Sequence, residues 1–217
     1  MQFFLVFSLP LIFTTIYLSI SRNTLPHWSG ISYLTLIPLG ALYISKGEKI
    51  IPRLQYGLVS LSVILMMAIL VINKGWFLPA SQSEEPQRLG KKDVLMDLYG
   101  WQQAREKLKP ILMEKGLDSY QIVSNRWYPA AHIDYYIAEP LGMKVYGLGD
   151  INNIHKYYWI NQENPPLKDS VLYITDSRNY ASPDIFKEYS SELIEAIPID
   201  RNGKPVKNLF LFKLMKN

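Results

Sequence analysis

The sequence predicts a membrane part of three α-helices, followed by a small extracytoplasmic α/β domain with a mostly parallel sheet and a C-terminal hairpin. The first observation is an uneven distribution of charge. Residues 1–73 contain four basic side chains and one acid, whereas the other 144 residues contain 19 basic and 18 acidic ones. The second is that helix-like and strand-like patterns alternate after residue 92. A wholly soluble globular protein is therefore excluded.

The first predicted span covers residues 1–20, which carry no charge and are long enough to cross a hydrocarbon core of about 30 Å. A cleaved signal peptide is the alternative. It would need basic residues before the apolar run and a small-x-small cleavage site after it. The run instead begins at the first residue and ends in Ser21-Arg22-Asn23, which favours a retained span.

Two further spans are expected, over residues 30–45 with Pro38 inside and over residues 54–72. The loop between them contains three basic residues, and the loop before them contains one. The positive-inside rule places the more basic loop in the cytoplasm. We therefore expect a multi-pass protein of the plasma (inner) membrane whose C-terminal domain is extracytoplasmic. Residues 74–92 form a linker, in which Trp76 and Phe77 suit the membrane interface.

The domain over residues 93–217 is predicted from periodicity and turn signals. Helices are expected at 99–114, where Pro110 can bend or end the helix, at 129–138, and briefly at 182–189. Strands are expected at 121–124, 144–148 and 171–175. A hairpin is expected from 193–199 and 208–215 around Asp200-Arg201-Asn202-Gly203. This order is typical of a small α/β sandwich.

Two segments are candidates for substrate binding. In the first predicted outer loop, His27 and Trp28 could contact a lipid phosphate or sugar, although an interfacial Trp beside a solvated His is the plainer interpretation. Asn125, Arg126 and Tyr128 follow a predicted strand, at the edge where α/β sheets bind ligands. Arg126 could bind a phosphate or carboxylate there, or instead form an ion pair with Asp134 or Glu139.

A third candidate is the polar and aromatic segment from Asn152 to Trp159, in which His155 and Trp159 are the proposed binding residues. Such a segment suits a sugar-binding surface, and it equally suits packing against headgroups or a partner. The segment Gly147-Leu148-Gly149-Asp150 lacks the third glycine of a dinucleotide loop, and no helix pattern follows it. His132 is interpreted as structural.

Several classes of function lack sequence support. The three histidines are scattered and cysteine is absent, which excludes disulfides, thiolate zinc sites and cysteine nucleophiles. The sequence contains no P-loop, no G-x-S-x-G elbow and no HExxH motif. No basic cluster with interleaved aromatics indicates nucleic-acid binding. No cofactor and no metal are expected.

Together these segments resemble the C-terminal part of bacterial membrane glycosyltransferases. The class is the dolichyl-phosphate-mannose-protein mannosyltransferase-like one (glycosyltransferase family 39, GT-C type), which is related to the lipid A aminoarabinose transferases. The resemblance rests on Pro26-His27-Trp28 before a Tyr-containing span, on Asp97-Leu98-Tyr99-Gly100-Trp101, and on three segments rich in aromatic residues. These segments are Asn125-Arg126-Trp127-Tyr128, Ile133-Asp134-Tyr135-Tyr136 and His155-Lys156-Tyr157-Tyr158-Trp159.

The resemblance implies transfer of a sugar from a polyprenyl-phosphate carrier to an extracytoplasmic acceptor, with a carboxylate as general base. In the family that carboxylate lies in the first outer loop, and this chain has no corresponding loop. We therefore expect a C-terminal portion whose catalytic N-terminal half is missing, whose partners are the bilayer and the lipid-linked sugar, and which is inactive alone. A short relative that lost the chemistry would show the same pattern. A membrane-anchored binding or scaffold module without catalysis is the alternative function.

Overall fold

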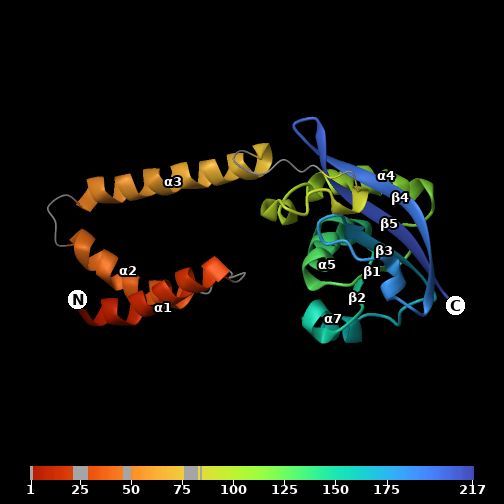
Figure 1. Ribbon diagram of the computed structural model, residues 1–217, viewed down its shortest axis with the longest axis horizontal. Coiled ribbons are helices and arrows are strands. Elements are labelled where there is room, and N and C mark those ends of the chain that lie inside the picture. Colours follow the sequence, from red (N-terminus) through yellow and green to blue (C-terminus); the bar gives the residue numbers. More distant parts are fainter. Residues whose placement is uncertain (1, 22–28, 46–49, 76–82, 84) are drawn as a thin grey trace. The chain divides into compact units, whose positions relative to one another are not determined.

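The computed structural model describes residues 2–21, 29–45, 50–75, 83 and 85–217. The chain divides into two compact units, Met1–Met67 and Ala68–Asn217 (Figure 1). Each unit is described by itself. The predicted outer-loop residues His27 and Trp28, and residues 76–82 and 84 of the predicted linker, lie outside the described residues.

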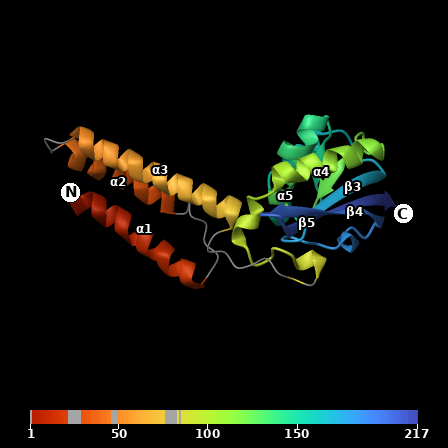
Figure 2. The same cartoon turned by 90° about the horizontal axis from the view of Figure 1, so that it is seen from above.

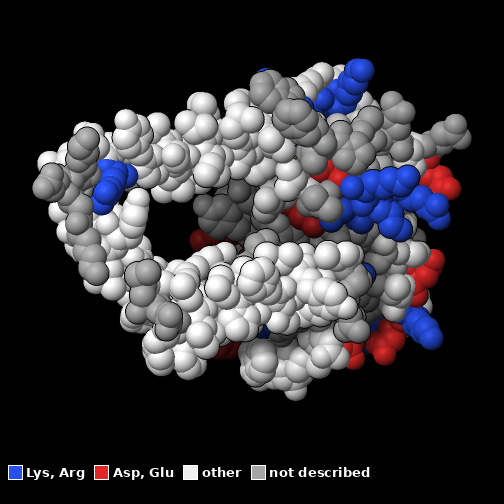
Figure 3. Space-filling model, turned by 60° about the vertical axis from the view of Figure 1, so that its left-hand side comes forward, with Lys and Arg blue, Asp and Glu red and all other residues white. Residues whose placement is uncertain are grey.

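The first unit consists of apolar helices. Helix α1 (Gln2–Ser21) packs against α2 (Gly30–Ser45), and α3 (Ile50–Lys74) begins in this unit. The hydroxyl groups of Ser8 and Thr35 are hydrogen bonded between α1 and α2, a contact of the kind that joins helices in lipid. The face seen in Figure 3 is almost free of charge on these helices, whereas acidic and basic side chains gather on the second unit.

Two of these helices, α1 and α3, are long and apolar enough to cross a membrane. Helix α2 has the bounds predicted for the second span, but its 16 residues extend only about 24 Å at 1.5 Å per residue. That length is shorter than a hydrocarbon core of about 30 Å. The expectation of three full spans is therefore corrected to two candidate spans and a shorter apolar helix.

The second unit contains a five-stranded sheet in the order β2-β1-β3-β5-β4. Its strands are β1 (Ile122–Ser124), β2 (Val145–Gly147), β3 (Ser170–Asp176), β4 (Tyr189–Arg201) and β5 (Lys204–Lys216). Strand β1 runs parallel to β2 and β3, whereas β5 is antiparallel to both β3 and β4. The predicted mostly parallel sheet is thus a mixed sheet, because the two longest strands belong to the hairpin.

The C-terminal hairpin is confirmed, and it is longer than predicted. Each of its strands has 13 residues, and they meet at Asn202 and Gly203, with φ of 54° and 75°. Both residues are left-handed, as a tight two-residue hairpin turn requires. Asn and Gly adopt this conformation at low cost, so the local sequence determines where the chain reverses.

The helices of the second unit follow the predicted pattern in part. Helix α4 (Trp101–Glu114) continues through Pro110, which is exposed, so that water can satisfy the carbonyl of Glu106 that a proline leaves unbonded. Helix α5 (Trp127–Ile133) passes into a π-helical turn, Asp134–Ala138, followed by a 3-10 turn, Glu139–Leu141.

The other helical elements are short. The predicted helix at 182–189 is only a 3-10 turn, Pro183–Ile185, capped by Ser182. Two helices without a recognised sequence pattern, α6 (Ile151–Ile154) and α7 (Tyr157–Glu163), connect β2 to β3. Further 3-10 turns cover Pro86–Arg88 and Val94–Asp97.

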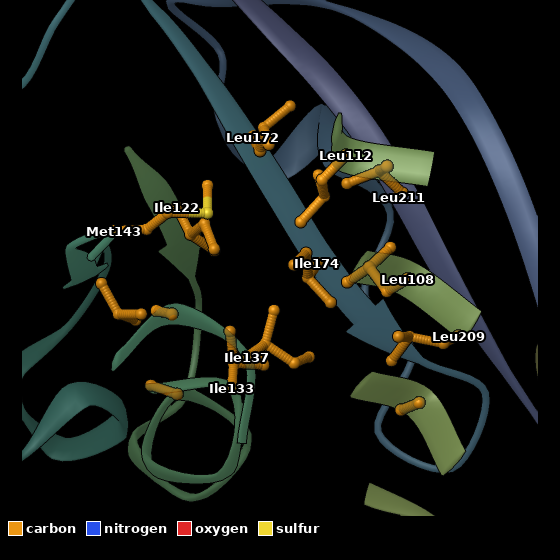
Figure 4. Close-up of a cluster of buried hydrophobic side chains, with 14 of the residues drawn as sticks. Leu108, Leu112, Ile122, Ile133, Ile137, Met143, Leu172, Ile174, Leu209 and Leu211 are labelled. Atoms are coloured by element: carbon orange, nitrogen blue, oxygen red, sulfur yellow. The ribbon is translucent and has the colours of Figure 1, made fainter. Parts of the chain in front are cut away.

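Helices α4 and α5 cover the same face of the sheet (Figure 2). Leu108 and Leu112 of α4 meet Ile122, Leu172 and Ile174 of the parallel strands in a continuous buried cluster (Figure 4). The opposite face is mainly aromatic, with Tyr146, Tyr173, Phe186, Phe210 and Phe212 buried together. The sheet is thus buried on both faces, which explains the near-continuous apolar runs of its inner strands.

Candidate functional site

The candidate site lies where β1 and β2 end. These two strands are parallel and in register, so the residues that follow them emerge at the same edge of the sheet. The backbone N–H of Leu148 donates to the carbonyl of Ser124 at 2.9 Å, which holds the two loops side by side. The predicted candidates Asn125, Arg126, Tyr128 and His155 all lie on or just beyond these loops.

A continuous series of ring contacts connects three segments that are distant in sequence. The Trp101 ring is stacked on His132 at 4.8 Å between centroids, and Tyr128 meets His132 edge-on at 4.7 Å. Trp127 contacts Tyr128 at 5.4 Å and is stacked on His155, also at 5.4 Å. The fold therefore brings the segments 97–101, 125–128 and 155–159 into one region.

His155 has an unusual backbone conformation that places its ring. Its φ is 48°, in a region that residues other than glycine rarely adopt, at the point where α6 ends and α7 begins. Helix α6 is itself started by Asp150, whose carboxylate accepts from the Asn152 N–H at 2.8 Å. The sharp reversal at His155 turns its imidazole back onto Trp127.

Arg126 precedes α5 with an extended backbone and an exposed side chain. Among the described residues, no carboxylate lies within ion-pairing distance of it, so the alternative pairing with Asp134 or Glu139 does not form. Its guanidinium group is therefore available to a phosphate or carboxylate. The neighbouring Asn125 accepts a long hydrogen bond, 3.4 Å, from the Tyr173 hydroxyl.

Exposed aromatic rings extend this edge toward α7. Trp127 is 40% exposed and Trp159 is 59% exposed, although large aromatic side chains are ordinarily buried. We call Trp127, His155, Tyr158 and Trp159 the aromatic surface. It contains two of the predicted binding residues, His155 and Trp159, next to a third, Arg126.

Sequence reasoning missed a charged network behind the rings. The carboxylate of Asp97 pairs with Arg178 Nε at 2.9 Å and accepts from the Asn179 amide, also at 2.9 Å. Asp176 and Lys207 are each 1% exposed, and the Lys207 ammonium lies 3.9 Å from the Asp176 carboxylate and 4.4 Å from the Trp101 ring. A usable signal existed, because Asp176 to Asn179 directly follow the predicted strand 171–175.

This environment favours the neutral forms of the central rings. Burial, followed by the charges of Asp97 and Asp176, raises the pKa of Tyr128 to about 12. Burial and then Lys207 lower the pKa of His132. His132 lies between Trp101 and Tyr128 in the series of rings, a packing role that agrees with its structural interpretation.

Two further predictions bear on the site. The described residues contain no group of three His, Cys, Asp or Glu side chains that could hold a metal ion. The truncated dinucleotide-like segment has a packing role instead: a Cβ on Gly147 would lie 2.6 Å from the Cβ of Tyr157 and 2.9 Å from that of Ile154. Glycine at this position lets α6 and α7 approach β2 closely.

No model of a known protein family, no curated protein and no solved structure matches this chain.

Proposed function

We propose that this chain is the carboxyl-terminal portion of a membrane glycosyltransferase, which moves a sugar from a polyprenyl-phosphate carrier to an extracytoplasmic acceptor. In this proposal the α/β domain binds substrate, and another part of the enzyme supplies the catalytic carboxylate. The apolar helices α1 and α3 hold the domain at the surface of a plasma membrane, and α2 accompanies them.

One observation carries the proposal: the series of rings from Trp101 through His132, Tyr128 and Trp127 to His155. It joins three of the four soluble segments on which the resemblance to this enzyme class rests, and His132 is also stacked on Tyr136 of the fourth at 5.9 Å. Their convergence on one edge supports a shared role. That edge also has the chemistry for a sugar phosphate, because indole faces suit the apolar faces of a sugar ring and Arg126 suits a phosphate.

The proposal is tested in native membranes with an antibody against residues 93–217. Removal of the antigen should remove the transfer of labelled sugar from a polyprenyl-phosphate donor to the endogenous acceptor. The purified 217-residue chain should catalyse no transfer by itself. Transfer by the purified chain would show that it contains its own catalytic group, and would contradict that part of the proposal.

A second measurement separates the enzyme from a membrane-anchored binding module. Trp159→Ala and Arg126→Ala should weaken photocrosslinking of a diazirine-labelled polyprenyl-phosphate sugar to the full chain, whereas the matched control Lys109→Ala should not. The binding module would be supported instead if the unaltered chain crosslinks to the labelled donor while transfer continues undiminished after removal of the antigen.

A further inference from the structure

A second site lies on the flank of the domain and is lined by residues of the π-helical turn and of α7. Helices α5 and α7 both pack beside the edge strand β2 (Figure 1). The site is a cavity of about 480 Å³, a volume typical of sites for small molecules. Its lining includes the buried apolar residues Met143 and Val145, together with charged and aromatic side chains.

The π-helical turn shapes this cavity. The N–H of Glu139 donates to the carbonyl of Asp134, five residues earlier, so the turn is wider than an α-helical one. Such single π-turns are rare and frequently occur at functional sites. Asp134 and Glu139 stand at the two ends of the bond, and both line the cavity, as does Tyr135 between them.

The cavity is lined by equal numbers of acidic and basic side chains. Asp134 and Glu139 contribute two carboxylates, and Lys144 and Lys156 contribute two ammonium groups. The buried Tyr157 hydroxyl donates to Asp134 at 3.4 Å, and burial raises the pKa of Asp134. The two carboxylates would repel a phosphate, and the two lysines would repel a cation, so neither charged ligand suits the cavity.

An aromatic ring completes the lining. Tyr135 is 66% exposed, and its ring is held by an edge-on contact with Tyr136 at 4.9 Å. A sugar ring presents apolar C–H groups on its faces and hydroxyl groups around its rim. An exposed aromatic face beside several charged donors and acceptors matches this distribution.

We infer that this cavity binds one neutral saccharide unit, with Tyr135 against a face of the sugar ring and the four charged side chains hydrogen bonded to its hydroxyl groups. The binding site itself rests on the cavity. Only the role of the saccharide, as part of the glycan acceptor, rests on the proposed function. The cavity adjoins the aromatic surface along the chain, because its lining residues Lys156 and Tyr157 lie between His155 and Tyr158, but the two share no residue.

The test uses the full chain in detergent micelles and ligand-observed saturation-transfer NMR with free glucose, mannose, galactose and N-acetylglucosamine. At least one of these neutral sugars should bind. Tyr135→Ala and Lys144→Met should each weaken binding about tenfold, the effect of losing one contact or one charged hydrogen bond. The matched control Lys109→Met, on the exposed side of α4, should leave binding unchanged. Tyr135 is exposed, so its variant keeps the fold.

Three outcomes would overturn the inference. They are binding of no neutral sugar, tighter binding of a phosphorylated hexose or of glucosamine, and binding that is insensitive to Tyr135→Ala but lost in Trp159→Ala. The last would assign the saccharide to the aromatic surface and leave the proposed function intact. Conversely, binding in the cavity together with unchanged transfer after removal of the antigen would refute only the proposed function.

Discussion

Lys207 is almost completely enclosed by the protein, although an ammonium group is costly to remove from water. Its Nζ donates to the carbonyls of Tyr99 at 2.8 Å and Met96 at 3.0 Å, and it faces the Trp101 ring and the Asp176 carboxylate. This one side chain therefore ties the segment before α4 to the sheet, and it supports the first ring of the candidate site.

Replacement of Lys207 by Met should lower the free energy of unfolding by about 3–5 kcal/mol, because it leaves Asp176 as a buried charge without its counterion. The measurement is urea unfolding of the full chain in mild detergent, followed by tryptophan fluorescence. The double variant Lys207→Met with Asp176→Asn should recover part of the loss. The exposed control Lys187→Met should change little, and an equal loss in that control would argue against the pairing.

His132 makes stability depend on pH. Burial lowers its pKa in the folded chain below the ordinary value of 6.5, so below pH 6.5 the unfolded chain binds more protons than the folded one. Stability should then rise with pH, from the lowered folded-state pKa up to about 6.5.

His132→Phe keeps a ring in the stack and removes the titration, so it should flatten that part of the profile of unfolding midpoint against pH. The control His155→Phe concerns an exposed imidazole and should leave the slope in place. A slope that persists unchanged in His132→Phe would assign the pH dependence to another group.

At the scale of elements, the connection between β2 and β3 contains two short helices that are stabilised by packing against the sheet rather than by their own helix propensity. Helices α6 and α7 have four and seven residues, which is too short for stability in isolation. They are held by burial of Ile154 and Tyr157 against Gly147 of β2, and by the Asn161 side chain, which donates to the Gly147 carbonyl at 2.7 Å.

Gly147→Ala should therefore disturb this connection. The added methyl would overlap Tyr157 and Ile154, and we expect a loss of about 1–3 kcal/mol, as for other overpacked cores. Hydrogen exchange should accelerate in residues 151–163. Gly203→Ala is the comparison, because it strains only the hairpin turn and meets no atom within 4 Å. Its effect should stay in β4 and β5.

At the scale of the whole molecule, the chain joins very apolar helices to a domain with mixed charges. Cysteine is absent, so each engineered cysteine is a unique label. The basic segment at residues 45–53, whose ends belong to α2 and α3, and the α/β domain are predicted to face opposite sides of the membrane.

Asp118→Cys, on an exposed loop of the domain, should react with a membrane-impermeant maleimide in intact cells. Lys46→Cys, in the basic loop, should react only after the membrane is permeabilised. The reverse pattern would invert the proposed orientation. Reaction of both cysteines in intact cells would contradict a membrane between the two positions.

The sequence by itself determined the features that depend on local chemistry. The scarcity of charge before residue 74 indicated apolar helices, the apolar runs located the inner strands, and Asn202-Gly203 placed the hairpin turn. The position of Asn125, Arg126 and Tyr128 at the end of a strand also followed, because the carboxyl ends of the strands are where such sheets bind ligands. That His155 lies at the same edge was shown only by the fold.

Only the tertiary structure decided the features that depend on contacts between distant residues. Insertion of β5 between β3 and β4 made the sheet mixed, since strand order is determined by pairing across the fold rather than by periodicity. The series of rings, the Lys207–Asp176 pair and the cavity beside the π-helical turn each join segments that lie 20 or more residues apart. Such contacts arise from burial that the chain achieves only when it is folded. A local pattern can place a residue such as Asp176 at the end of a strand, but it does not name the partner.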